Sequence, residues 1–218
     1  NKALTLQASR KFDEALQEYE NVLKIRFDDP QAHFNMGIIF QTILHFDKAE
    51  KSFRKTIRAK KDFQLAYQYL GNALIAQSRH EEAVKAFKKG LLINPFMPSS
   101  YVNLALSLAT LGNFENAIFE MTKAMKVDDK RKEHYTNLAA ILRGYEPLYY
   151  SQTIANRFLE ILYNETVARP NELGIVAVTL LKHEESIKNC LHIMKQDNAA
   201  LDIEAVSYTH LRAHETVG

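Results

Sequence analysis

The sequence predicts an all-α protein, an α-solenoid of antiparallel helix hairpins stacked one on the next. Two observations support this fold class. Small and apolar residues recur in columns with a fixed period of 34 residues. Helix-breaking residues are scarce, with 7 glycines and 5 prolines in 218 residues. Such a period is typical of repeat proteins in which each unit buries its apolar face against its neighbours.

The repeat is visible in three columns that share one register. One column holds only alanine, one holds small residues, and one holds large, mostly aromatic residues. Their members are Ala15, Ala49, Ala83 and Ala117; Ala3, Gly37, Gly71, Ala105 and Ala139; and Tyr19, Phe53, Phe87 and Met121.

Within one period the apolar residues follow helical spacing. Tyr67, Leu70 and Leu74 mark one face of a first helix, and Ala83 and Phe87 mark one face of a second helix. The small residues allow the two helices to pack closely, and the large residue fills the space between them and the next hairpin. Each hairpin therefore has an apolar face that only a neighbouring hairpin can cover.

Residues 64–97 carry the fullest pattern, with Tyr67, Leu70, Gly71, Leu74, Ala83, Phe87 and Pro95. This pattern resembles the tetratricopeptide repeat (TPR) family. The resemblance implies antiparallel hairpins wound into a right-handed superhelix. It divides residues 1–143 into a partial repeat 1–29, the repeats 30–63, 64–97 and 98–131, and the first helix of a fifth repeat at 132–143.

The pattern fades beyond residue 143. We expect residues 144–205 to form divergent helices that cap the array or lead to a further segment, with helices near 148–168, 171–182 and 184–196. Residues 206–216 read VSYTHLRAHET and resemble a translated sequencing adapter. We therefore expect residues 206–218 to be an artefactual tail.

The resemblance also implies a binding surface, because the first helix of each TPR hairpin lines a concave groove. One groove position holds four asparagines in five repeats. An asparagine amide offers a donor and an acceptor, so it can pair with a peptide backbone of any sequence. Asparagine at this position is also part of the general TPR pattern, which leaves a purely structural interpretation open. The predicted groove residues are Phe34, Asn35, Ile38, Gln68, Tyr69, Asn72, Val102, Asn103, Leu106 and Asn137.

Two functions agree with this surface. The first is a protein–protein interaction scaffold that binds an extended peptide in the groove. The alternative is the substrate-recruiting arm of a larger glycosyl-, methyl- or sulfotransferase. We expect no enzymatic activity, metal or cofactor in this chain, because it has no glycine-rich phosphate loop and no nucleophile–base motif, and Cys190 and His192 lack a second pair of ligands.

Charge and cysteine content limit the classes of partner and the cellular compartment that we expect. A net charge of +2 gives no argument for nucleic acid or an anionic membrane as the main partner, so we expect neither. Basic clusters such as Lys85, Lys88 and Lys89 fall on second helices, where we expect a solvated outer face. The single cysteine fits a reducing compartment, so we expect a cytoplasmic protein with a protein or peptide partner. The identity of that partner and the oligomeric state stay open.

Overall fold

A computed structural model describes residues 2–128 and 132–144 of the chain. The helices expected within 144–205, and the tail 206–218, lie outside the described residues. The chain divides into two compact units, and the boundary in the sequence lies between Leu111 and Gly112. Each unit is described by itself.

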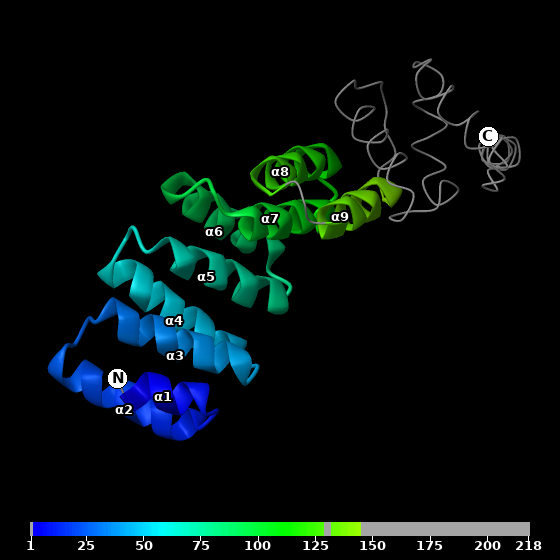
Figure 1. The fold of residues 1–218 in the computed structure, drawn as a ribbon. Coiled ribbons are helices and arrows are strands. Elements are labelled where there is room, and N and C mark those ends of the chain that lie inside the picture. The colour runs from blue at the N-terminus through cyan, green and yellow to red at the C-terminus, as the bar shows by residue number, and fades with distance from the viewer. Residues whose placement is uncertain (1, 129–131, 145–218) are drawn as a thin grey trace, which may run out of the picture. The chain divides into compact units, whose positions relative to one another are not determined.

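The first unit is a stack of helices, each joined to the next by a short turn (Figure 1). In chain order they are α1 (Lys2–Ala8), α2 (Phe12–Ile25), α3 (Pro30–Thr42), α4 (Phe46–Ala59), α5 (Gln64–Ala76), α6 (His80–Ile93) and α7 (Pro98–Thr110). Helices α3 and α4 fall inside the predicted repeat 30–63, and α5 and α6 fall inside the predicted repeat 64–97. The predicted all-α stack of hairpins is therefore confirmed.

Packing in this unit follows the chain. Every helix packs on the one that follows it, from α1 to α7. The first helices of successive hairpins also touch, α3 with α5 and α5 with α7. This arrangement places α3, α5 and α7 in one row, which gives the unit a continuous surface made of first helices.

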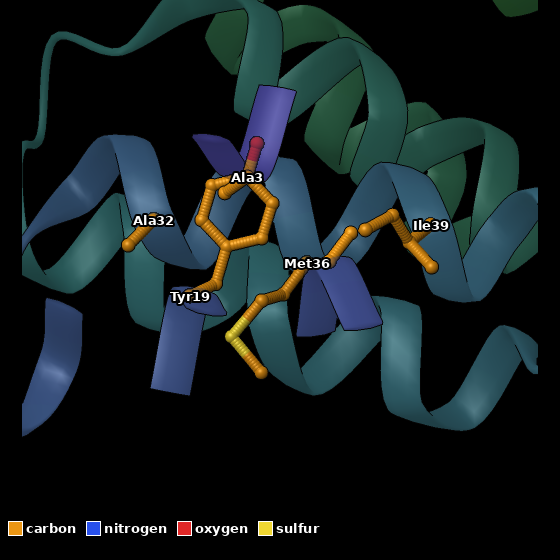
Figure 2. Packing of buried hydrophobic residues seen from close by; sticks show 6 residues of the cluster. Ala3, Tyr19, Ala32, Met36 and Ile39 are labelled. Atoms are coloured by element: carbon orange, nitrogen blue, oxygen red, sulfur yellow. The ribbon is translucent and has the colours of Figure 1, made fainter. Parts of the chain in front are cut away.

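The small and aromatic columns meet in the core. A Cβ added at Gly37 would lie 2.5 Å from the ring of Phe53, and one added at Gly71 would lie 2.5 Å from the ring of Phe87. Both rings are completely buried. The glycines thus let each aromatic ring lie directly on the backbone of the first helix. Where the column holds Ala3, the ring of Tyr19 lies beside it, followed by Met36 and Ile39 along α3 (Figure 2).

The turn inside each hairpin has one shared conformation. Arg10, Leu44, Ser78 and Gly112 occur 34 residues apart, and all have positive φ, between 57° and 75°. In three of them the next residue donates a backbone hydrogen bond five residues back, as from His45 to Phe40 at 2.8 Å. This pattern is the Schellman motif, in which a left-handed residue ends a helix and satisfies its last carbonyl groups.

The second unit contributes α8 (Phe114–Val127) and α9 (Lys132–Arg143) to the described residues. These helices pack against each other. Ala117 and Met121 on α8 are fully buried, as are Leu138 and Leu142 on α9. In the described part of the chain, none of the helices combines the length and hydrophobicity needed to cross a lipid bilayer.

Candidate functional site

All of the predicted groove residues lie on first helices, as the repeat register requires. Helix α3 carries Phe34, Asn35 and Ile38; α5 carries Gln68, Tyr69 and Asn72; α7 carries Val102, Asn103 and Leu106; and α9 carries Asn137. Because α3, α5 and α7 touch in order, the structure brings the first three groups together. Asn137 is half-buried within the second unit.

Two asparagines join neighbouring hairpins on this surface. Asn103 Nδ2 on α7 donates a hydrogen bond of 2.8 Å to Asn72 Oδ1 on α5. Both side chains are only partly buried. Each amide has one donor group and one acceptor group, so the bond leaves Asn72 Nδ2 and Asn103 Oδ1 available. The pair therefore presents one donor and one acceptor side by side, as a peptide group requires.

The side chains around this pair give the surface its mixed character. Gln68 and Tyr69 on α5, and Val102 and Leu106 on α7, are all partly exposed. We call these four residues, together with Asn72 and Asn103, the first-helix surface. It combines amide groups with aliphatic and aromatic carbon, which suits a peptide with spaced apolar side chains.

The Asn35 side chain is buried and forms its hydrogen bonds within the protein. Its side chain is 6% exposed, and its Oδ1 accepts a hydrogen bond of 3.0 Å from Gln31 Nε2. Burial raises the pKa of Tyr19, and a hydrogen bond between Tyr19 and Asn35 opposes this shift. Asn35 thus helps to join α2 to α3, and it contributes little to the exposed surface. The i, i+4 spacing of Gln31 and Asn35 is the sequence signal for this bond.

Phe34 is also buried, with 5% of its surface exposed. Its ring contacts three other aromatic rings, with centroids 5.8 Å from Phe53, 4.8 Å from Phe63 and 5.4 Å from Tyr69. The contact with Tyr69 is edge-on, a favourable arrangement for two rings. This cluster joins the second hairpin to the third and holds Tyr69 in place at the edge of the first-helix surface.

His33 behaves as a packing residue. It is 6% exposed, and it stands in the column that holds Tyr67 and Tyr101 in the next two repeats. Burial, followed by the positive charge of Lys55, lowers its pKa, so the imidazole stays neutral near pH 7. Among residues 2–128 and 132–144, no three His, Cys, Asp or Glu side chains gather in a way that could hold a metal ion.

Family comparisons match three stretches of the chain. Residues 8–43 match a profile described as TPR repeat, and residues 64–96 and 98–131 each match a profile described as tetratricopeptide repeat. A comparison with curated protein sequences finds no significant match. The transferase-arm alternative therefore stays a prediction.

Solved structures show the same fold. A MamA structure from Desulfovibrio magneticus RS-1 is 19% identical, with a TM-score of 0.66, and the match covers 76% of this chain and 92% of that one. YrrB, described as a TPR protein with an unusual peptide-binding site, is 14% identical with a TM-score of 0.64 and 88% of each chain covered. TTC0263, a thermophilic TPR protein of Thermus thermophilus, is 19% identical with a TM-score of 0.54, and the match covers 87% of this chain and 95% of that one.

Proposed function

Residues 8–131 of this chain belong to the tetratricopeptide repeat family, and we propose that this protein-interaction scaffold binds an extended peptide segment along α5 and α7. The observation that carries the proposal is the Asn72–Asn103 pair. It offers an unused amide donor and an unused amide acceptor next to each other on a partly exposed surface. A peptide backbone offers the complementary carbonyl and N–H groups at every residue.

The surrounding residues define the kind of peptide. Val102 and Leu106 lie one helical turn apart on α7, and Tyr69 lies on α5. None of the six residues of the first-helix surface is charged. Backbone pairing at the asparagines, with one or two aliphatic or aromatic side chains against this carbon, gives affinity without requiring charge on the peptide. The proposed partner is therefore an uncharged or weakly charged segment with spaced apolar anchors.

Phe34, Asn35 and Ile38 have a secondary part in this proposal. Asn35 and Phe34 are buried and hold α3 in place, whereas Ile38 is partly exposed on α3. We propose that the core of the site is the α5–α7 pair and that these three residues support it. Asn137 belongs to the second unit and holds the same predicted groove position in its own repeat.

A displayed peptide library tests the proposal. Random peptides of about 12 residues are selected on the immobilised full chain, and the enriched peptides are titrated into the wild type and into Asn72→Ala/Asn103→Ala. Loss of two polar contacts costs roughly 1–3 kcal/mol, so the affinity is expected to fall by about 5- to 150-fold. Circular dichroism and thermal unfolding establish that the variant is folded.

Lys51→Ala/Lys88→Ala is the matched control, because both lysines are exposed on second helices. Its affinity for the selected peptides is expected to equal that of the wild type. Selected peptides that bind the double asparagine variant as tightly as the wild type would place the binding site elsewhere, and the asparagines would then serve only the fold.

A further inference from the structure

A pocket lies on the opposite side of α5 from the first-helix surface. It has a volume of about 350 Å³ and is formed by α4, α5 and α6 of the first unit. Its α5 wall consists of Tyr67, Leu70 and Leu74. Because a helix turns by about 100° per residue, these three lie on the other side of α5 from Gln68 and Asn72.

The floor of the pocket is apolar. It is formed by Leu70 and Leu74 of α5, Ile57 of α4 and Ala86 of α6. Leu70, Leu74 and Ala86 are at most 5% exposed, so the carbon surface is recessed and does not project into solvent. The Tyr67 hydroxyl donates a hydrogen bond of 3.1 Å to the Lys61 carbonyl, which fixes the phenol at the edge. The floor has room for one large apolar side chain.

The rim is strongly basic. It holds Arg54 and Arg58 from α4, Lys85 and Lys89 from α6, and the single carboxylate of Glu82. That carboxylate is already neutralised, because Arg54 Nη2 lies 3.2 Å and Arg79 Nε lies 2.7 Å from its oxygens. The rim therefore carries an excess of positive charge above an apolar floor.

Three of the rim cations are unpaired within the part of the chain that the structure describes. Arg58, Lys85 and Lys89 are exposed and have no carboxylate within ion-pair distance among those residues. Arg54 differs, since it is held by Glu50 and Glu82. The free charges lie around the opening, and their natural complement is a set of carboxylates.

We propose that this pocket binds an acidic peptide segment with the pattern acid–apolar–acid in extended conformation. Lys85 and Lys89 are four residues apart on α6, which separates them by about 6 Å along the helix. In an extended chain, residues i and i+2 project to the same side and lie about 6.6 Å apart. Two carboxylates at these positions reach the two lysines, and the residue between them projects the other way, into the floor.

The recessed floor favours a peptide over a membrane as the occupant. A surface that lies on a bilayer presents protruding apolar side chains beside its cations. Here the cations project, and most of the apolar carbon is buried beneath them. Only a ligand that extends its own apolar group into the pocket can reach that carbon. The site is separate from the first-helix surface and does not depend on the function proposed for it.

A labelled peptide tests the proposal on the full chain. The probe is acetyl-Gly-Glu-Phe-Glu-Ser-amide with a fluorophore on a linker, and binding is followed by fluorescence anisotropy. Lys85→Glu/Lys89→Glu is expected to weaken binding by about tenfold or more, because two attractions become repulsions. Raising NaCl from about 50 mM to about 300 mM is also expected to weaken it, because the rim charges are exposed and screened by salt.

Matched controls separate the contributions of the rim charge, the first-helix surface and the apolar floor to binding of the probe. Lys51→Glu/Lys88→Glu has the same charge change outside the pocket, and Asn72→Ala/Asn103→Ala alters only the first-helix surface; both are expected to bind the probe within about twofold of the wild type. A probe with serine in place of phenylalanine is expected to bind at least about fivefold more weakly, since it leaves the apolar floor empty.

Three results would overturn the proposal. The first is a probe that does not bind, and the second is equal binding to the wild type and to Lys85→Glu/Lys89→Glu. The third is sedimentation of the chain with vesicles of about 30% anionic phospholipid, lost in Lys85→Glu/Lys89→Glu, together with no peptide binding. That third result would assign the basic rim to a membrane surface. None of these results changes the outcome of the separate test of the first-helix surface.

Discussion

Leu44 shows how much one backbone angle matters in a repeat. It has a φ of 61° in the turn between α3 and α4, and its side chain is 72% exposed. A residue with a Cβ loses roughly 1–2 kcal/mol in the left-handed conformation. The exposed side chain gains little burial to offset this cost. Gly112, at the same place in its own repeat, has a φ of 75° and no such penalty.

Replacing Leu44 by glycine is therefore expected to stabilise the protein. The relief of backbone strain exceeds the extra entropy of glycine in the unfolded chain, for a net gain of about 0.5–1 kcal/mol. Urea unfolding of Leu44→Gly should show a higher midpoint with an unchanged slope. Gly112→Ala is the reciprocal variant, and it is expected to be destabilised although a Cβ there meets no atom within 4 Å. If Leu44→Gly is instead destabilised, the leucine side chain stabilises the fold by more than its left-handed backbone conformation destabilises it.

At the scale of elements, ion pairs join α4 to α6. Glu50 accepts from Arg54 of its own helix at 2.8 Å and from Arg79, the residue before α6, at 2.5 Å. Glu82 contacts the same two arginines. Burial would raise the pKa of Glu50, but hydrogen bonds from Arg54, Arg79 and Gln77 outweigh it, and the net pKa is lowered. The hydrogen bond from Arg79 lowers the pKa of Glu82.

These shifts predict a loss of stability in acid. A carboxylate whose pKa is lower in the folded state stabilises the fold above its unfolded pKa, near 4.5 for glutamate. That stabilisation is present at neutral pH and is lost as the pH falls below about 4.5 toward the folded pKa. Thermal unfolding of the wild type should therefore shift to lower temperature over this range.

Glu50→Gln isolates this contribution. At neutral pH it is expected to cost about 1–2 kcal/mol, because it removes the charge from hydrogen bonds that two arginines donate. The melting temperature of this variant should then depend less on pH than that of the wild type. Glu20→Gln, an exposed site on α2, provides the control and should keep the wild-type profile. Parallel pH profiles for Glu50→Gln and the wild type would contradict the assignment.

Particular residues show what the sequence could predict about these elements. The columns of Ala83 and Phe87 were enough to predict the hairpins, because each hairpin repeats the same local packing. The burial of Phe34 was not predictable, since it depends on Phe63, the residue before α5, and on Tyr69 of the next hairpin. The interpretation of Lys85 and Lys89 as part of a solvated face did not include the pocket, which three separate helices form.

Over the first unit as a whole, the contacts between helices are unevenly distributed. Helix α5 contacts α3, α4, α6 and α7, whereas α1 packs mainly on α2 and buries only Ala3. In a stack of this kind each hairpin is stabilised by its neighbours, so the helices with neighbours on both sides open last.

Hydrogen exchange followed by mass spectrometry should show this gradient. Peptides from α5 are expected to exchange slowest, and those from α1 to exchange close to the rate of an open chain. Tyr19→Ala, which removes a buried ring between α1 and α3, should speed exchange in α1 and α2 and leave α6 unchanged. Equal protection of α1 and α5 would mean that the unit opens only as a whole.

The position of α5 has one more consequence. Its two sides carry Asn72 toward one proposed ligand and Leu70 toward the other. A single helix thus forms part of both sites, so a tilt of α5 favoured by one ligand would alter the affinity for the second. Thermodynamic linkage would make that influence mutual, since the factor by which one ligand changes the affinity for the other applies equally in the reverse direction. A scaffold with such a shared helix would then respond to the presence of both partners together.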